Sequence, residues 1–201
     1  MEEINMKTIK FGKYFYNEDE LQEIEWIVLD ENHDGKKLLL SKFCIETMQY
    51  EYEQNDNPNP KWDNCVLRSW LNGYFIDNFF TSSEKEKLCP ITITTPTGIE
   101  LNDKITLLCI EEVAKYLPSE KERKSKPTPW AKRSRCNEWG EEESIYTDHG
   151  FCTWLLRNPS SKVNNNWTGI NPQGSIDEIG GDIFFSGEQG IRPVILLDTK
   201  E

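Results

Sequence analysis

The sequence has little of what nucleophilic catalysis and nucleic-acid binding usually require. Only two histidines occur among 201 residues, and the six cysteines form no C-x-x-C pair. The formal net charge is −12, which disfavours a general nucleic-acid binder because phosphate neutralisation needs clustered Lys and Arg. The same charge disfavours docking on anionic membranes. These shortages exclude whole classes of partner before any motif is considered.

Long apolar runs are also missing. No stretch approaches the roughly 18 apolar residues of a membrane-spanning helix. The N-terminal stretch "MEEINMKTIKFGKY" lacks the apolar segment of a secretory signal. We therefore expect a cytoplasmic protein whose cysteines are reduced, mostly buried thiols. A surface or phage-particle context stays open.

What is present suits one compact domain. The chain contains seven Trp, seven Tyr and nine Phe, enough bulky material for a core that needs neither disulfides nor metal. We expect a single domain over residues 1–201, with its core at about 11–197. No internal repeat or low-complexity tract interrupts it.

The hydrophobic pattern predicts strands at the N-terminal end and helices after them. Ile24–Leu29 and Lys37–Phe43 flank turn residues at 32–35, which indicates a β-hairpin. Apolar residues at three and four spacing from Val66 to Phe75 indicate a helix, with Asp63 or Asn64 as its cap.

Further along, 81–88 reads as a short helix capped by Ser82 or Ser83. Ile105–Leu108 reads as a strand, followed by a helix over Ile110–Leu117 with Cys109 at its N-cap. Residues 118–150 are polar and irregular, and a loop this long is usually functional or mobile. Short strands fill the final third, so the order of elements predicts an α+β domain.

Eight short motifs occur in one order and together resemble a known family. They are "FGKY", "IEWIVLD", "LLLSK", "LRSWLNGYF", "DKITLLCIEEVAKYL", "PTPWAK", "WLLRNP" and "GIRPVILL". The chain resembles an uncharacterised bacterial domain family related to the C-type-lectin-like fold, in the branch that includes formylglycine-generating enzymes. The resemblance implies antiparallel strands, short helices, long irregular loops, and adjacent N- and C-terminal strands. "IEWIVLD" and "RPVILLD" would then be neighbours, with the ligand-binding side opposite them.

The chain departs from that family at several positions. Asn158 and Ser160 stand where Ser and Gly are typical, and Cys109 stands where Ser usually begins the helix. A single Trp, Trp154, replaces the usual pair. These departures leave any shared ligand open.

Two arginines border apolar runs and precede prolines. Arg157 lies in "WLLRNP" and Arg192 in "GIRPVILL". Because a buried guanidinium keeps its charge, it needs acidic or carbonyl partners. We expect both arginines to be structural and neutralised by internal acids. We expect the functional residues to lie in the segment between them.

The segment 163–190 between them is rich in Asn, Gly and Trp. Such residues supply adaptable hydrogen bonds beside an aromatic platform, although Asn and Gly also simply make turns. Both interpretations stay open. The candidates for ligand binding are Asn165, Asn166, Trp167, Asn171, Gln173 and Glu188.

Basic residues gather in 121–135, where seven Lys and Arg stand against one acid. The segment could grip an acidic partner, or it could be a solvated loop on the protein's own acidic surface. The candidates for partner contact are Lys124, Lys126, Arg133 and Arg135.

Metal and catalytic signals are weak. Asp177, Glu178 and Asp182 offer oxygen ligands for calcium without EF-hand spacing. His149 and Cys152 do not form a recognised nucleophile arrangement. A copper-dependent oxidase of the resembled branch would need a thiolate pair, for which Cys136 and Cys152 are the late cysteines.

We therefore expect a non-catalytic module that binds a protein or glycan and has no cofactor. An oxidase and an accessory subunit of a bacterial or phage complex are the alternatives.

Overall fold

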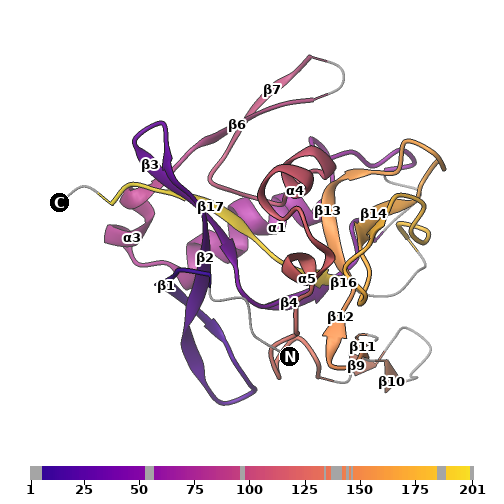
Figure 1. Ribbon diagram of the computed structural model, residues 1–201, viewed down its shortest axis with the longest axis horizontal. Helices are drawn as coiled ribbons and strands as arrows, with labels where there is room; N and C mark the ends of the chain where they lie inside the picture. The colour runs from indigo at the N-terminus through magenta and orange to yellow at the C-terminus, as the bar shows by residue number, and fades with distance from the viewer. Residues whose placement is uncertain are drawn as a thin grey trace.

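A computed structural model describes residues 6–52, 57–95, 98–133, 135–136, 142–143, 145, 147–184 and 189–199. The fold is mixed α+β, with mostly antiparallel strands and short helices, as the order of elements predicted. Figure 1 shows the chain from indigo N-terminal strands to a yellow C-terminal strand that runs through the middle of the molecule.

The first sheet is strongly curled and antiparallel, with the strand order β1-β2-β3-β17-β5, and β8 also pairs with β17. Its hairpin β2–β3 is the one predicted around residues 32–35. β1 carries a bulge between Lys10 and Lys13, where Gly12 has φ +66° and faces the Phe80 ring. The bounds are β1 (Thr8–Phe15), β2 (Leu21–His33), β3 (Lys36–Ser41), β5 (Leu88–Cys89), β8 (Ile105–Thr106) and β17 (Val194–Leu197).

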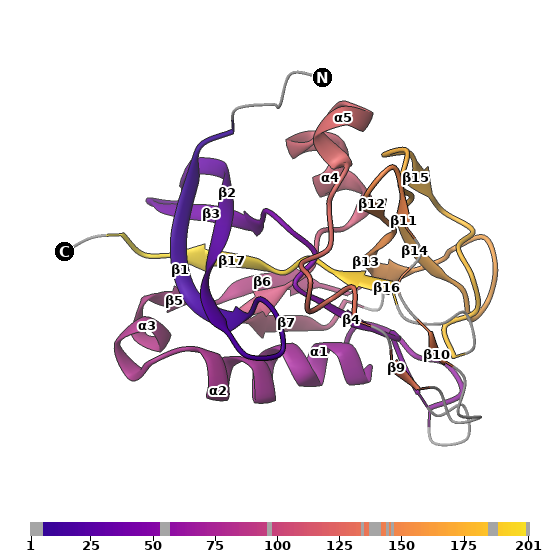
Figure 2. The same cartoon turned by 90° about the horizontal axis from the view of Figure 1, so that it is seen from below.

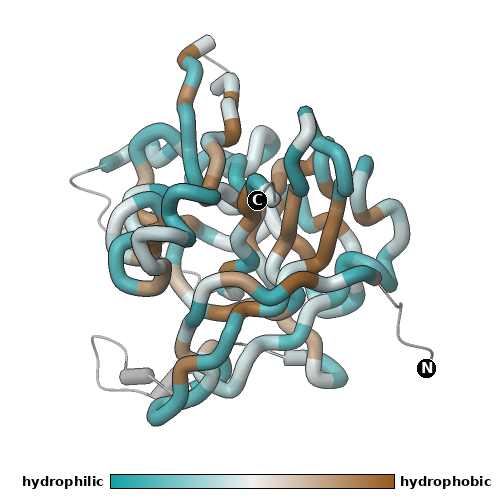
Figure 3. The backbone as a smooth tube through the Cα atoms, turned by 90° about the vertical axis from the view of Figure 1, so that its left-hand side faces the viewer, coloured by the Kyte–Doolittle hydropathy of each residue, from teal (hydrophilic) through white to brown (hydrophobic). Residues whose placement is uncertain are grey.

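The central strands β3 and β17 are apolar on both faces, because both faces are covered. Successive side chains of a strand point to opposite sides. Leu39 and Ile195 therefore join the core on one face, while Leu40 and Val194 join the core on the other. Figure 3 shows these hydrophobic strands in the interior and hydrophilic segments at the hairpin ends.

The second sheet has the strand order β15-β14-β13-β16-β4. β13 and β16 are parallel, and its other pairs are antiparallel. Figure 2 shows the two sheets side by side. The bounds are β4 (Glu46–Met48), β13 (Trp154–Pro159), β14 (Trp167–Ile170), β15 (Ile176–Asp177) and β16 (Gln189–Ile191).

The chain crosses between the two sheets twice at one junction. It passes from β3 to β4 and returns from β16 to β17 through Arg192 and Pro193. Ser41 donates its backbone N–H to the Pro193 carbonyl, and Ile45 donates to the Ile191 carbonyl. Arg192 therefore lies where the two crossings run side by side.

One continuous helix over residues 66–79 lies beneath the sheets (Figure 2). It consists of α1 (Val66–Trp70), the π-helical turn η1 (Leu71–Phe75) and α2 (Ile76–Phe79). Its buried side chains Leu67, Leu71 and Phe75 join the larger core cluster. The N-cap is Cys65 rather than Asp63 or Asn64, because Asn64 Oδ1 accepts the Lys61 N–H instead.

The shorter helices have polar caps. α3 (Ser82–Lys87) is capped by Thr81 rather than by Ser82 or Ser83, since Thr81 and Glu84 form a capping box. α4 (Ile110–Tyr116) has Cys109 at its N-cap, as predicted. α5 (Glu120–Arg123) lies inside the stretch expected to be irregular, with a capping box between Ser119 and Glu122.

The remaining strands form small antiparallel pairs. In Figure 1, the β6–β7 hairpin projects beyond the sheets. The bounds are β6 (Ile91–Thr94), β7 (Glu100–Asp103), β9 (Arg135–Cys136), β10 (Glu142–Glu143), β11 (Thr147–Asp148) and β12 (Phe151–Cys152).

The expected adjacency of the terminal strands needs correction. The strand containing "IEWIVLD" is β2, and the strand containing "RPVILLD" is β17; both lie in the first sheet, but β3 separates them. The reason is the tight β2–β3 hairpin, which places β3 next to β2 and leaves its outer edge for β17.

Candidate ligand-binding pocket

A pocket of about 450 Å³ lies where the β6–β7 hairpin, the start of α4 and the end of β13 meet. This volume falls within the range of small-ligand pockets, about 300–1,000 Å³. Four short segments supply most of its walls. They are 61–63, 93–95, 109–111 and 157–161, with Thr168 and Glu178 completing the rim.

Asp103 fixes one wall by joining three elements. Its carboxylate accepts the Trp62 indole N–H at 2.7 Å and the Arg68 guanidinium at 2.6 Å and 2.9 Å. Asp103 ends β7, Arg68 belongs to α1, and Trp62 lines the pocket. Because Asp103 is 1% exposed, this buried ion pair holds the hairpin against the helix.

Arg157 forms the inner wall and is already neutralised. Its guanidinium lies 3.2 Å from the Glu112 carboxylate and donates to the Leu107 carbonyl at 2.8 Å. Its backbone N–H donates to the Leu108 carbonyl. Arg157 therefore ties β13 to the segment that leads into α4, and it has the acidic partner that the sequence analysis expected.

Cys109 contributes a thiol that stays protonated. Burial and the Glu112 carboxylate raise the pKa of Cys109 to about 12. Hydrogen bonding with this thiol in turn lowers the pKa of the Glu111 carboxyl, which keeps Glu111 ionised. Since the thiolate is the nucleophilic form of cysteine, the wall of the pocket carries a charged carboxylate beside an unreactive thiol.

Asn158 leaves a hydrogen-bond acceptor unused beside this wall. Its Oδ1 atom is buried and accepts no hydrogen bond from the described residues. Its backbone carbonyl is occupied by the Thr168 hydroxyl. A buried amide oxygen without a donor is costly, and because this atom is closed to solvent, only a rotation of the Asn158 side chain would expose it to a ligand in the pocket.

The lining combines charged and apolar residues. Asp63, Glu111 and Glu178 supply carboxylates and Lys61 an ammonium group, while the charges of Arg157 and Glu178 are matched by Glu112 and Lys162. The apolar part of the lining comes from Trp62, Ile93, Ile110 and Pro159.

The amide-rich candidates lie outside this lining. Asn166 Nδ2 donates to the Ile179 carbonyl at 2.8 Å. Asn171 Oδ1 accepts the Gln173 and Ser175 N–H groups, both at 3.0 Å, and Gln173 Nε2 donates to Asp148.

Asn165 and Trp167, two other members of that set, are also occupied by local structure. Asn165 has φ +58° in a turn, and Trp167 is buried within the core. Glu188 lies outside the described residues. These contacts support the turn interpretation, while the ligand-surface hypothesis for this set stays a prediction.

The calcium candidates do not converge. Asp177 Oδ1 accepts the backbone N–H groups of Ile179 and Gly180, and Asp182 Oδ1 accepts the Phe184 N–H. Glu178 pairs with Lys162 at 2.9 Å. Within the described ranges, no three His, Cys, Asp or Glu side chains gather as a metal site would require.

The basic candidates have different surroundings. Arg133 contacts the buried Glu46 carboxylate at 3.1 Å and stacks 3.5 Å from the Trp130 ring centre. The ammonium groups of Lys124 and Lys126 lie over the Phe151 ring. The side chain of Arg135 lies outside the description. Hence Arg133 is held within the protein, while the partner-contact hypothesis stays a prediction.

Cys152, one of the two late cysteines of the proposed copper pair, lies beside another cysteine, and the Cys136–Cys152 pair stays a prediction. The sulfur of Cys152 lies 3.3 Å from the sulfur of Cys44. The side chain of Cys136 lies outside the description. His149 is 90% exposed on its side chain and contacts Asp148 at 3.6 Å.

Sequence reasoning selected Arg157 but missed the pocket beside it. Asp63 and Cys109 stand out in the sequence only as candidate helix caps. The segments that meet here are separated by many residues, and nothing local in them predicts that they converge. The usable signals are Cys109, Asn158 and Ser160, which depart from the pattern of the resembled family and all line the pocket.

Comparison with known proteins places the chain in one family. Residues 34–199 match the model of the family described as "Domain of unknown function (DUF6273)", and the chain belongs to that family. No curated protein and no solved structure matches it.

Membrane insertion by a helix finds no support in the structure. No helix in the described part of the chain is long and apolar enough to cross a membrane. The expected cellular compartment stays a prediction.

Proposed function

We propose that this protein is a non-catalytic binding module whose recognition site is the pocket between β6, α4 and β13. The observation that carries the proposal is the pocket of about 450 Å³, whose lining combines the carboxylates of Asp63 and Glu111 with apolar side chains. Asn158 also lines it, and its buried Oδ1 accepts no hydrogen bond from the described residues. A ligand that turned this side chain toward the pocket would supply the missing donor.

The ligand is a protein segment that inserts a Lys or Arg side chain. Such a side chain places its apolar stem on a hydrophobic wall and its charge in a polar environment. The lining offers Ile93 and Ile110 for the stem, and Glu111 and Asp63 for the charge. The net charge of −12 attracts a basic partner over longer distances. A glycan, the other ligand class that the sequence left open, would gain less from these carboxylates.

The state of the cysteine supports binding over catalysis. The pKa of about 12 leaves Cys109 as a thiol at neutral pH. His33 and His149, the chain's two histidines, lie in or beside hairpin turns and do not line the pocket. The C-type-lectin-like relationship fits this proposal, because the resembled fold binds ligands on irregular loops.

The test uses a matched pair of variants on one hairpin. Thr94 lines the pocket, and Thr92 is an exposed residue on the same face of β6 that does not. Thr94→Trp fills the pocket and should abolish capture of Lys- and Arg-containing peptides on an array. Thr92→Trp should leave capture unchanged.

A charge variant then tests the ligand class. Glu111→Gln should weaken binding of the captured peptides about tenfold, or ~1.4 kcal/mol. Binding that survives Thr94→Trp would refute the pocket. Selective binding on a glycan array that is lost in Thr94→Trp would keep the pocket but replace the ligand class.

An oxidase remains the second candidate because two cysteines, Cys44 and Cys152, do converge. Soft thiolates hold Cu(I). Both cysteines are fully buried and neither lines the pocket. Copper(I) titration with thiol counting distinguishes this candidate: stoichiometric uptake lost in Cys152→Ser would favour it.

A further inference from the structure

A buried cluster of two thiols and one guanidinium lies at the junction of the two sheets, away from the pocket. Cys44 precedes β4, Cys152 belongs to β12, and Arg192 follows β16. All three side chains are essentially inaccessible, with exposures of 0%, 0% and 1%. The cluster uses none of the residues that carry the proposed binding function.

The two sulfurs meet because β16 has no side chain between them. Gly190 lies in β16, which pairs with β4 on one side and with β13 on the other. A Cβ atom on Gly190 would lie 2.8 Å from the Cys44 sulfur. The glycine therefore leaves the space in which the Cys44 sulfur approaches the Cys152 sulfur to 3.3 Å, although 108 residues separate the two cysteines.

Arg192 was expected to be neutralised by an internal acid, but no carboxylate in the described part of the chain pairs with it. Its Nε donates to the Ser41 carbonyl at 2.7 Å, and its guanidinium lies 5.0 Å from the Trp154 ring centre. Its buried NH1 group has no hydrogen-bond partner among the described residues. An unpaired buried charge is strongly unfavourable, and the groups that can supply negative charge beside it are the two sulfurs.

The protonation of the pair agrees with this geometry. Burial opposes ionisation of Cys44, but the hydrogen bond from Cys152 and the charge of Arg192 lower the pKa of Cys44 below its ordinary value. The same hydrogen bond, together with burial, raises the pKa of Cys152. Of the two sulfurs, Cys44 is therefore the more readily ionised, and Cys152 keeps its proton.

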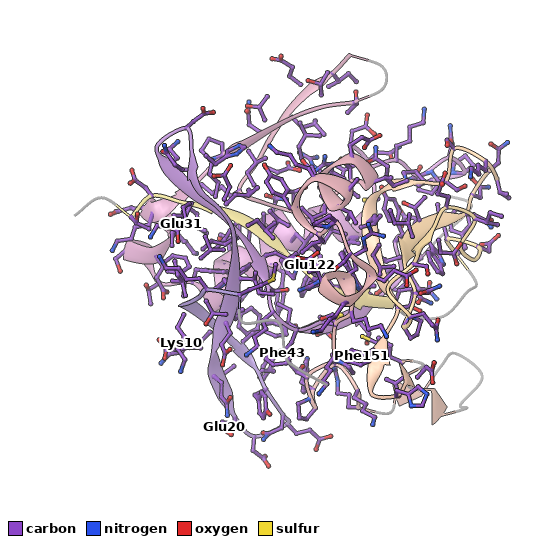
Figure 4. All side chains as sticks on the ribbon, viewed as in Figure 1. Lys10, Glu20, Glu31, Phe43, Glu122 and Phe151 are labelled. Carbon is purple, nitrogen blue, oxygen red and sulfur yellow. The ribbon has the colours of Figure 1, made fainter. Side chains whose placement is uncertain are left out.

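A short segment covers the pair and is pinned to both cysteines. Cys44 donates its N–H to the Lys126 carbonyl, and Thr128 donates to the Cys44 carbonyl. Cys152 donates its N–H to the Ser125 carbonyl. Figure 4 labels Phe43 and Phe151, the residues that precede the two cysteines, and Glu122 of α5. Local opening of residues 125–128 would admit a molecule as small as hydrogen peroxide.

We propose that Cys44 and Cys152 are a redox modification site, in which a hydroperoxide oxidises Cys44 and Cys152 then closes a disulfide. The Cys44 thiolate attacks the peroxide, the O–O bond breaks, and the departing oxygen takes a proton to leave water and a sulfenic acid. The Cys152 sulfur then attacks the Cys44 sulfur. The S–O bond breaks, and a second water leaves with the thiol proton.

The overall change balances: two thiols and one hydrogen peroxide give one disulfide and two waters. The thiols lose two electrons and the peroxide gains them. A small dithiol reverses the step by thiol–disulfide exchange. Arg192 is a positioning residue here, since it acts through the Cys44 sulfur.

The experiment treats the full chain with hydrogen peroxide, then alkylates the remaining thiols in denaturant and maps them by mass spectrometry. We expect a linked Cys44–Cys152 peptide, loss of two of the six thiols, and recovery with dithiothreitol. Cys65 is the internal control, because it is equally buried at 1% and its sulfur hydrogen-bonds to the Trp62 carbonyl and the Arg68 N–H rather than to a described thiol. It should stay reduced.

Three variants separate the steps. In Cys152→Ser, a dimedone adduct should accumulate on Cys44, because no second sulfur resolves the sulfenic acid. Arg192→Met should slow disulfide formation at least tenfold, while Arg192→Lys, which keeps the positive charge, should slow it less.

Three results would overturn the proposal. The first is oxidation of Cys65 or Cys89 while Cys44 and Cys152 remain thiols. The second is oxidation of the pair to unlinked acids. The third is an unchanged rate in folded Arg192→Met, which would remove the role of Arg192. If that variant fails to fold, the wild-type map and the dimedone result decide the matter.

Discussion

At the scale of single residues, the two arginines that look alike in the sequence have different surroundings. Arg157 is paired with Glu112 and anchors the start of α4. Arg192 is bound to the Ser41 carbonyl and to no described carboxylate. The sequence could predict that both are buried, because each borders an apolar run. It could not predict which partner each would meet, because those partners come from distant segments.

Arg157→Met should destabilise the protein by about 2–4 kcal/mol, because it leaves Glu112 partly buried without its cation. Urea unfolding measures the loss. The control is Lys7→Met, which breaks an ion pair whose side chains are 62% and 50% exposed, and which should cost less than about 1 kcal/mol. Full stability with lost ligand binding would instead assign Arg157 to recognition.

Cys109 should react slowly with iodoacetamide at neutral pH. With a pKa of about 12, about one thiol in ten thousand is ionised at pH 8, and only thiolate reacts. The alkylation rate should rise about tenfold per pH unit up to pH 10, as followed by peptide mass spectrometry. A rate that levels off near pH 9 would show that burial and Glu112 do not raise the pKa of this thiol.

At the scale of elements, the capping boxes explain where prediction succeeded and where it failed. Cys109, the predicted N-cap of α4, donates its backbone N–H to the Glu112 carboxylate at 2.8 Å and so completes a capping box. The same Ser/Thr-x-x-Glu spacing occurs at Thr81–Glu84 and Ser119–Glu122. The predicted caps of α3, Ser82 and Ser83, lie one or two residues after Thr81. α5 lies inside a stretch that was expected to be irregular. Both could have been found from the sequence.

Glu84 joins α3 to the bulge of β1. Its carboxylate accepts the Thr81 N–H at 2.7 Å and the Gly12 N–H at 3.2 Å. Burial opposes ionisation, but these hydrogen bonds outweigh it and lower the pKa of Glu84 below its ordinary 4.5. A carboxyl whose pKa is lower when folded stabilises the protein above its unfolded pKa, and this contribution disappears as the pH falls through the folded value.

Glu84→Gln should therefore cost about 1 kcal/mol at pH 7, the usual size of a lost cap, and less at pH 3.5. Urea midpoints at the two pH values measure this difference. Glu86→Gln, an exposed neighbour on α3, should change little at either pH. An equal effect of Glu84→Gln at both pH values would contradict the role of its charge.

At the scale of the whole molecule, local patterns predicted the elements but not how they come together. The mixed α+β class and the β2–β3 hairpin follow from periodicity and turn residues, and the structure confirms both. Two features depend on contacts between distant segments. They are the position of β3 between β2 and β17, and the pocket. The stretch expected to be irregular shows what local patterns could not predict. The backbone of residues 125–128 within it is hydrogen-bonded to Cys44 and Cys152.

The pocket beside Asn158 is tested most directly by a chemical-shift map. Backbone amide signals of the ¹⁵N-labelled protein would be followed during titration with a short Lys- and Arg-containing peptide that the array selects. We predict saturable shifts that cluster at residues 109–111 and 157–161, vanish in Thr94→Trp and persist in Thr92→Trp. Shifts confined to the turns at 165–173, or equal shifts in both variants, would contradict the account.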